Sequence, residues 1–170
     1  MKLSQGFAPV ARPDARTLIL GSMPGVASLE AGQYYAFPRN AFWEIMGDLF
    51  DAGPDLDYPA RLDVLVSNQV ALWDVIETCH RPGSLDSAIA KDGMKTNNFG
   101  LFFKEHPKIN RVFFNGSKAS DLFRKRVLPG LAQKPECITL PSSSPAHASM
   151  NYAAKLEAWS VIKGLSLIHI

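Results

Sequence analysis

The chain has 170 residues, of which 46% are hydrophobic and 20% charged, values typical of one compact globular domain with a full core. No stretch approaches the roughly 20 apolar residues of a membrane span, and the amino terminus lacks the apolar run of a signal peptide. The net charge of +2 neither requires nor opposes a nucleic-acid partner. We therefore expect a single domain over residues 1–170, located in the cytoplasm.

Only two cysteines occur, Cys79 and Cys137, and they lie far apart in the sequence. Such a pair forms neither a metal-binding box nor a dense disulfide framework, which favours a reducing compartment.

In chain order, the first half of the sequence begins with an apolar run that predicts a strand over Thr17–Leu20. Apolar residues then recur at helical spacing at Phe42, Ile45, Met46 and Leu49. Asn40 precedes them as the predicted N-cap of this helix. A second helix is predicted from Pro59 to about Ser67, and a second strand over Val70–Val75.

The second half repeats this alternation. The predicted elements are a helix over Phe99–His106, a strand over Arg111–Phe114, a helix over Lys118–Val127, a strand over Cys137–Leu140 and a last helix with Tyr152, Leu156 and Trp159 on one face. All four strands are continuously apolar, as in a parallel sheet covered on both faces. The sequence therefore predicts a three-layer α/β/α sandwich around a four-stranded, mostly parallel sheet.

Three of the predicted strands end in unusual loops: Gly21–Gly25, Asn115–Ser117 and Pro141–His147. Ligands of open parallel sheets bind beyond the carboxyl ends of the strands. The first loop, GSMPG, has glycines that allow a ligand to approach the backbone, although a tight turn leading to Val26 explains it equally well. It is not a phosphate-binding P-loop, because the Lys-Ser/Thr ending is missing.

The segment Gln33–Trp43 combines aromatic and polar side chains. Its tyrosines and Phe37 offer stacking surfaces, Arg39 suits a phosphate, and Asn40 can orient a water. The alternative is that the aromatic residues belong to the core and that Asn40 only caps a helix.

The last loop, Leu140–Ala148, reads LPSSSPAHA. Its hydroxyls and backbone N–H groups suit phosphate contacts. A serine-rich lead into a helix would explain the serines, but not His147 between small residues.

Together, these segments resemble the uracil-DNA glycosylase superfamily. GSMPG is similar to its first motif, G-(I/M)-N-P-G in two branches, and YAFPRNAFW is similar to F-A-H-P-x-N-x-F-W of the mismatch-specific branch. PSSSPAHA stands where the superfamily carries its second motif. GSMPG, followed by PRN and then by SPAHA, is most similar to the pattern of the hypoxanthine-DNA glycosylase branch. The resemblance covers nearly the whole chain.

The resemblance implies a monofunctional glycosylase that flips a deaminated base, hypoxanthine or uracil, out of DNA and hydrolyses its glycosidic bond. Met23 replaces the asparagine of the first motif and cannot orient a water, so the catalytic role falls to Asn40, with His147 contacting the leaving base or a phosphate. The implied base pocket comprises Gly21, Ser22, Met23, Pro24, Tyr35, Asp74 and Asn115. Tyr35 would stack on the base, and Asp74 would accept from its N–H, unless Asp74 only caps a strand end.

The implied DNA contacts are Arg39, Lys118 and the loop Ser142, Ser143, Ser144, Pro145 and Ala146, which would pinch the strand. Arg124–Arg126 is more typical of a solvated helix face. The motifs contain no lysine that is an obvious Schiff-base nucleophile, so no lyase activity is expected. Two cysteines cannot supply the four ligands of an iron–sulfur cluster, so we expect no cofactor and no metal, and a monomer near the nucleoid.

Two other functions stay open: a non-catalytic nucleic-acid-binding module of the same fold, and a hydrolase built on Ser143 and His147. The latter lacks a G-x-S-x-G elbow. The apolar ending LSLIHI, residues 165–170, is either an extra strand or a non-native tail.

Overall fold

The computed structural model describes residues 3–147 and 149–163, so the segment 165–170 lies outside the described residues. The strands are β1 (Leu3–Gln5), β2 (Thr17–Gly21), β3 (Val70–Asp74), β4 (Ile76–His80), β5 (Lys95–Thr96), β6 (Arg111–Asn115) and β7 (Glu136–Leu140). The α-helices are α1 (Val26–Ala31), α2 (Phe42–Phe50), α3 (Tyr58–Ser67), α4 (Phe99–Glu105), α5 (Ser117–Arg126) and α6 (Tyr152–Trp159).

Four parallel strands form the central sheet in the order β3-β2-β6-β7. These are the four strands that the apolar runs predict, each within a residue or two at its ends. Thr17 is aligned with Val70 on one side and with Arg111 on the other, so the carboxyl ends of the strands lie at one edge.

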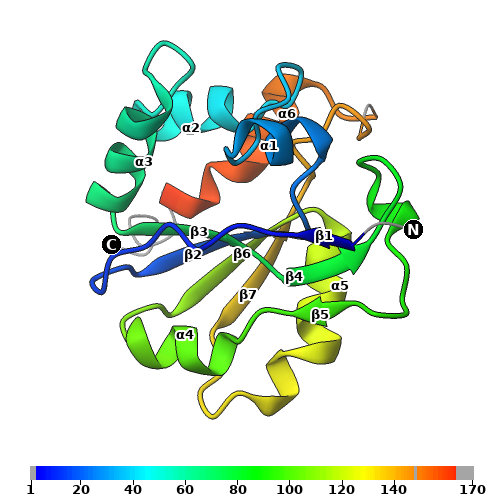
Figure 1. The fold of residues 1–170 in the computed structure, drawn as a ribbon. Helices are drawn as coiled ribbons and strands as arrows, with labels where there is room; N and C mark the ends of the chain where they lie inside the picture. Colours follow the sequence, from blue (N-terminus) through cyan, green and yellow to red (C-terminus); the bar gives the residue numbers. More distant parts are fainter. Residues whose placement is uncertain (1–2, 148, 164–170) are drawn as a thin grey trace.

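Helices cover both faces of this sheet, which confirms the three-layer sandwich (Figure 1). Alternate residues of β2 enter opposite cores: Leu18 and Leu20 pack with α4 and α5, and Ile19 packs with α2, α3 and α6. The continuous apolar runs therefore arise because both faces of the inner strands are buried. The edge strand β7 is only partly buried.

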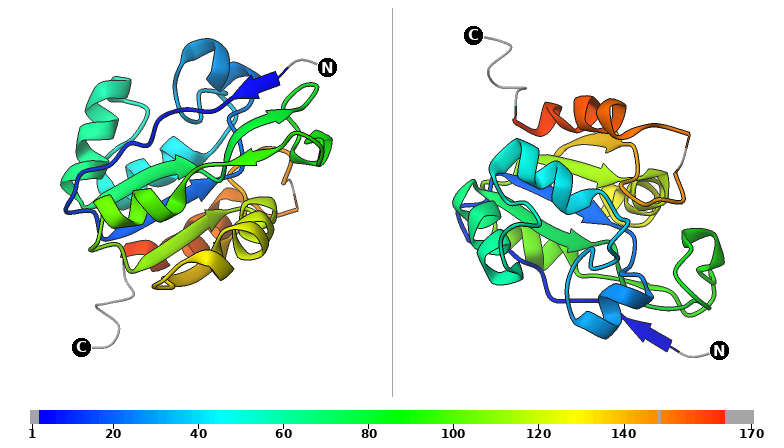
Figure 2. Two further views of the ribbon diagram at one scale, coloured as in Figure 1. Left: turned by 60° about the horizontal axis from the view of Figure 1, so that its bottom comes forward. Right: turned by 90° about the horizontal axis from the view of Figure 1, so that it is seen from above.

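A second sheet, β1-β4-β5, is antiparallel and was not predicted. The predicted strand Val70–Val75 ends one residue early because the chain turns there. Val75 N–H donates to Gly21 O at 2.8 Å and Ile76 N–H donates to Ser22 O at 3.1 Å, after which β4 pairs with β1. Figure 2 shows this small sheet extending from the carboxyl end of β3. Its short strands have mixed burial, so they carry no clear period-2 pattern.

The starts of the helices also differ in detail from the predictions. The N-cap of α2 is Ala41 rather than Asn40, but the Asn40 side chain still accepts from Phe42 N–H at 3.0 Å. The helix α3 has Asp57 as its N-cap, and the carboxylate accepts from Ala60 N–H at 3.0 Å. No helix in the described part of the chain combines the length and apolar character needed to cross a membrane.

The connections after β2 and β6 leave toward opposite faces of the sheet. β2 leads to the layer of α1, α2 and α3, whereas β6 leads directly to α5 on the other face (Figure 1). Neighbouring parallel strands whose connections diverge leave a crevice between their carboxyl ends, where ligands of such sheets bind. The predicted loops Gly21–Gly25 and Asn115–Ser117 lie at this point.

Candidate active site at the carboxyl edge of the sheet

The closest approach in the crevice occurs around Gly21, the last residue of β2. A Cβ added to Gly21 would lie 2.5 Å from Asp74 Oδ1 and 2.8 Å from Tyr35 Oη, so only glycine fits without displacing these groups. Asp74 ends the neighbouring strand β3, and Tyr35 comes from the connection before α2. Three residues predicted for the pocket, distant in sequence, therefore meet at one place.

Asp74 is an incompletely satisfied buried carboxyl group. The residue is 3% exposed, and its Oδ2 has no hydrogen-bond partner among residues 3–147 and 149–163. Burial, followed by the negative charge of Asp86, raises the pKa of Asp74 to about 7, while Arg81 opposes the shift. A buried polar atom without a partner costs folding free energy, and buried groups with a shifted pKa are found most often at functional sites.

Tyr35 has an unusual backbone conformation for an aromatic residue, with φ of 55°. This left-handed conformation is held from both sides: Tyr34 N–H donates to Tyr58 Oη at 3.0 Å, and Ala36 N–H donates to Ser28 Oγ at 3.0 Å. Strain that the surroundings enforce in this way is common at binding sites.

The Tyr35 side chain is equally constrained. Its ring stacks on Phe42 with centroids 4.0 Å apart, and its buried hydroxyl, which lies near the side chain of Asn115, forms no hydrogen bond of good geometry with the described residues. Burial, and next the charge of Asp74, raise the pKa of Tyr35, so the hydroxyl keeps its proton. The site thus contains an unused hydroxyl donor beside an unused carboxyl acceptor.

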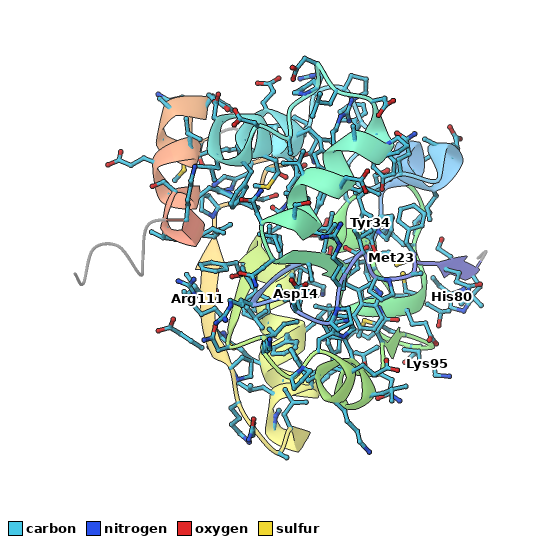
Figure 3. The ribbon with its side chains drawn as sticks, turned by 90° about the vertical axis from the view of Figure 1, so that its left-hand side faces the viewer. Asp14, Met23, Tyr34, His80, Lys95 and Arg111 are labelled. Carbon is cyan, nitrogen blue, oxygen red and sulfur yellow. The ribbon has the colours of Figure 1, made fainter. Side chains whose placement is uncertain are left out.

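Within the GSMPG loop, the side chains of Ser22 and Met23 have different surroundings. The Ser22 hydroxyl donates to Asp86 Oδ1 at 2.5 Å. The Met23 side chain is 7% exposed and packs in the core shared with Leu20 and Val75. Met23 follows the carboxyl end of β2 and lies far from Arg111, which begins β6 (Figure 3). Only the backbone of Met23 can therefore line a pocket.

The segment Arg81–Asp86 holds this loop and was missed in the sequence. Arg81 is 5% exposed and its Nη2 donates to Pro24 O, while Ser84 Oγ accepts from Val26 N–H at 2.8 Å. Nothing local in the sequence marks these residues, because their partners lie more than 50 positions away.

Asn115 joins the end of β6 to the last loop through a pair of hydrogen bonds. Its Nδ2 donates to Ser143 Oγ at 2.8 Å, and its Oδ1 accepts from Ser143 N–H at 2.8 Å. Ser143 O in turn accepts from Ala41 N–H at 3.0 Å, which ties the loop to the segment containing Asn40. The second predicted motif and the third are thus directly connected.

This arrangement corrects the prediction for Ser143. The residue is 1% exposed, and its N–H, C=O and hydroxyl groups all bind within the protein, so it is not available to contact a phosphate. Its hydroxyl is paired with Asn115 rather than with His147, which also argues against a serine hydrolase.

Asn40 is half-buried, and its position is fixed by two hydrogen bonds. Its N–H donates to Phe37 O at 2.9 Å and its Oδ1 accepts from Phe42 N–H at 3.0 Å. A carbonyl oxygen has a second lone pair, so the same amide can cap α2 and bind a water. The adjacent Arg39 is exposed.

The rest of the last loop is held by local hydrogen bonds. Ser142 Oγ accepts from Ser144 N–H at 3.1 Å, and Ser144 Oγ accepts from Ala146 N–H at 3.2 Å. Ser144 O accepts from His147 N–H at 3.0 Å and from Lys155 Nζ at 3.2 Å. Lys155 is 5% exposed, burial lowers its pKa, and no motif in the sequence marks this role.

The remaining members of the predicted site lie around this loop. Ser142, Ser144, Pro145 and His147 are half-buried, whereas Ala146 is exposed. Lys118 is half-buried at the second position of α5, two residues after Gly116. All of them are therefore near the carboxyl edge of β6 or β7, and their DNA contacts stay predictions.

Comparison with known proteins adds an independent finding. Residues 8–163 match the family described as the Uracil DNA glycosylase superfamily. The chain is 35% identical over 159 residues to a hypoxanthine DNA glycosylase of Methanosarcina acetivorans, covering 92% of this chain and 97% of that protein. A hypoxanthine DNA glycosylase of Methanosarcina barkeri is 38% identical over 120 residues, covering 69% and 73%.

A solved structure is similar over the same extent. It is a solution NMR structure of a candidate uracil DNA glycosylase from Methanosarcina acetivorans, with a TM-score of 0.79 and 32% sequence identity. The match covers 97% of this chain and 99% of that one.

Proposed function

This chain belongs to the uracil DNA glycosylase superfamily, and on that premise we propose that it is a monofunctional, monomeric DNA glycosylase of one domain. Its substrates are deaminated bases in DNA, hypoxanthine first and uracil second, and its product is an abasic site. The names of the two similar proteins support the preference for hypoxanthine.

The observation that carries this proposal is the pair of side chains beside Gly21, Asp74 and Tyr35, each of which has one buried polar atom, Oδ2 and Oη, without a hydrogen-bond partner among the described residues. Hypoxanthine presents an N1–H donor next to its O6 acceptor, and uracil presents the same pattern with N3–H and O4. Ionised Asp74 accepts from the N–H, and the Tyr35 hydroxyl donates to the carbonyl. Adenine presents the reverse pattern, and so it would leave both protein groups without partners.

Tyr35 therefore acts through its hydroxyl as well as its ring. One face of the ring is occupied by Phe42, so a flipped base stacks only against the other face. The hydroxyl and Asp74 then contact the edge of the base, and the backbone of Gly21–Met23 lines the pocket.

Hydrolysis requires a water at C1′ on the side opposite the departing base. In our proposal Asn40 binds that water through Oδ1, and its hydrogen bond to Phe42 N–H keeps the amide oriented. The water oxygen bonds to C1′ and gives up one proton to solvent, the bond from C1′ to the base nitrogen breaks, and the base leaves with the electron pair and takes up one proton from solvent. His147 and the pocket N–H groups stabilise the departing base.

The test uses end-labelled oligonucleotides that contain inosine, uracil or only normal bases, treated with alkali to cleave abasic sites. We expect release from inosine and uracil, and a loss of about 100-fold or more in Asn40→Ala because the water loses its position. Asn110→Ala, an exposed asparagine at the opposite edge of the sheet, is the matched control and should keep the wild-type rate.

Two outcomes would contradict the proposal. Binding to DNA without release of any deaminated base indicates a non-catalytic module. Ester hydrolysis that Ser143→Ala abolishes, without base release, indicates the serine hydrolase.

A further inference from the structure

A basic groove lies beside the proposed pocket and is not needed for the chemistry described above. It is a cavity of about 180 Å³ whose wall includes Lys91, Lys118, Lys125 and Arg126, with Asp121 as the one carboxylate. We call these five residues the basic groove.

The sequence builds the groove from one face of α5. Leu122 is 8% exposed and packs in the core, which fixes how the helix is rotated. Lys118, Asp121 and Lys125 follow at positions i, i+3 and i+7, so they lie along one side of the helix. This side extends for about 10 Å at 1.5 Å per residue.

The basic residues of the cluster Arg124–Arg126 therefore do not all face the same part of the protein. Arg124 turns toward β7: its Nε donates to Ser120 Oγ at 2.9 Å and its guanidinium lies 5.6 Å from the centre of the Phe114 ring. Lys125 and Arg126 instead line the groove and are exposed. Only the latter two are candidates for an external partner.

The groove begins where the proposed site ends. α5 starts directly after Asn115 and Gly116 at the carboxyl end of β6, so Lys118 stands next to the site. The opposite wall contains Lys91, on the segment that follows the Arg81–Asp86 anchor of the GSMPG loop.

The charges of the groove are not neutralised within the protein. Among residues 3–147 and 149–163, the ion pair formed is Lys95–Glu77, at 3.7 Å, and none involves a cation of the groove. Four cations against one carboxylate give a local field far more positive than the net charge of +2 suggests. The volume is below the 300–1,000 Å³ typical of small-molecule sites, but an open groove of this kind can hold phosphate groups one after another.

We propose that the basic groove binds backbone phosphates of the DNA strand that flanks the extruded nucleotide. The proposal rests on the proposed glycosylase function, because it takes the lesion-containing strand as the occupant. The groove then fixes the strand on one side of the lesion, while the residues on either side of the buried Ser143, namely Ser142 and Ser144–Ala146, contact it at the lesion.

The test compares Lys125→Gln/Arg126→Gln with Lys104→Gln/Lys108→Gln, which removes the same charge from exposed residues of α4 and the turn after it. Affinity for an inosine-containing duplex is measured by fluorescence anisotropy over a range of salt concentrations. For the groove variant we expect weaker binding and a plot of log affinity against log salt that is shallower by about 1 to 2. The control should keep the wild-type slope.

A second arm uses duplexes shortened on the 5′ or the 3′ side of the lesion. The difference between wild type and the groove variant should vanish for one of the two. The proposal is overturned if the groove and control variants change binding equally, if neither changes it, or if the difference persists with both shortened duplexes. Because anisotropy reports binding whether or not the base is released, a wild type that releases no base refutes the proposed function separately, and the slopes still decide the groove.

Discussion

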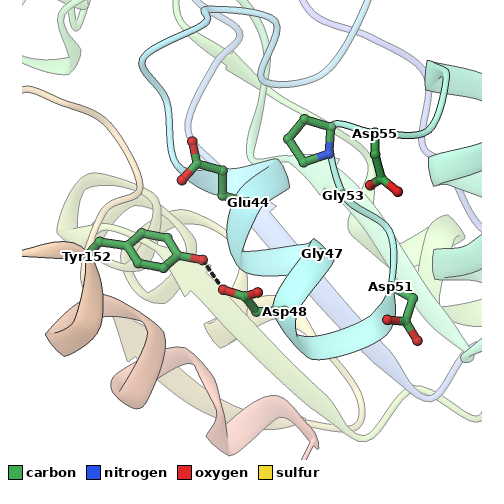
Figure 4. A pocket seen from close by; sticks show the side chains of 8 residues that line it. Glu44, Gly47, Asp48, Asp51, Gly53, Asp55 and Tyr152 are labelled. Carbon is green, nitrogen blue, oxygen red and sulfur yellow. Dashed lines mark hydrogen bonds between the residues drawn. The ribbon is translucent and has the colours of Figure 1, made fainter.

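The acidic cavity between α2 and α6 and the carboxyl edge of the central sheet both contain carboxylates, but in opposite surroundings. The acidic cavity, about 380 Å³, is lined by Glu44, Asp48, Asp51, Asp55 and Tyr152 (Figure 4). Its four carboxylates are exposed to water, and Tyr152 Oη donates to Asp48 Oδ2. At the sheet edge, Asp74 is 3% exposed, and one of its oxygens has no partner in the described part of the chain.

The size of a cavity and the number of charges that line it therefore do not identify an active site. The acidic cavity is the larger of the two hollows described above, yet its field repels DNA, and no three metal-ligating side chains among the described residues are placed to hold an ion. At the sheet edge, by contrast, buried polar atoms of Asp74 and Tyr35 find no hydrogen-bond partner within the part of the chain that the structure describes.

The largest expected effect is on stability at Asp74. The rise of its pKa from 3.8 to about 7 means that the folded protein holds the proton more tightly than the unfolded chain. The free energy of unfolding should therefore fall as pH rises from about 4 to about 7, by up to ~4 kcal/mol. We expect Asp74→Asn to stabilise the protein at pH 8 by an amount approaching this limit, measured by urea unfolding.

Two controls accompany that measurement. At pH 4 the advantage of Asp74→Asn should nearly disappear, because Asp74 is then protonated in the folded protein. Asp51→Asn makes the same change at an exposed position of the acidic cavity, where φ is 63° and asparagine is well tolerated. It should alter stability by less than about 0.5 kcal/mol at either pH; an equal effect of both substitutions would remove the distinction between the two regions.

The next effect is on the rate of base release in Gly21→Ala. The new Cβ must displace Asp74 Oδ1 and Tyr35 Oη, since it would lie 2.5 and 2.8 Å from them. Misplacing binding groups by about 1 Å lowers rates by about 100-fold, and single-turnover assays on inosine would measure this loss. Gly130→Ala, where a Cβ meets nothing within 4 Å, should react like the wild type.

Asn115→Ala tests the connection between β6 and the last loop. The substitution leaves Ser143 N–H and Oγ buried without their partners, which should cost about 1–3 kcal/mol in the free energy of unfolding. Chemical denaturation measures the change. Asn68→Ala removes a single exposed hydrogen bond to Val64 O and should cost less. If the two variants were equally stable, the pairing of Asn115 with Ser143 would not be what holds the loop.

The smallest effect is expected for Tyr152→Phe in the acidic cavity. The variant loses one exposed hydrogen bond to Asp48, so the free energy of unfolding should fall by no more than about 1 kcal/mol. Base release should be unchanged, because Tyr152 lies outside the proposed site. A clear loss of activity would show that the acidic cavity takes part in the function after all.

Much of the fold was predictable because it depends on local patterns. The strands β2, β3 and β6 are buried on both faces, and strands buried in this way consist of a continuous run of apolar residues. The buried residues of α2 likewise recur at helical spacing in the sequence. The small sheet β1-β4-β5 escaped prediction because pairing between partly buried strands leaves no such period.

The candidate site divides in the same way. Turn residues after parallel strands mark the three segments that meet at the sheet edge, and residue type alone excludes Met23 from holding a water. The burial of Ser143, the orientation of Arg124 away from Lys125 and the anchoring of the GSMPG loop by Arg81–Asp86 depend instead on tertiary contacts. The reason is physical: burial and hydrogen-bond satisfaction depend on partners far along the chain, such as Ser22 and Asp86, whereas periodicity reports only on neighbours.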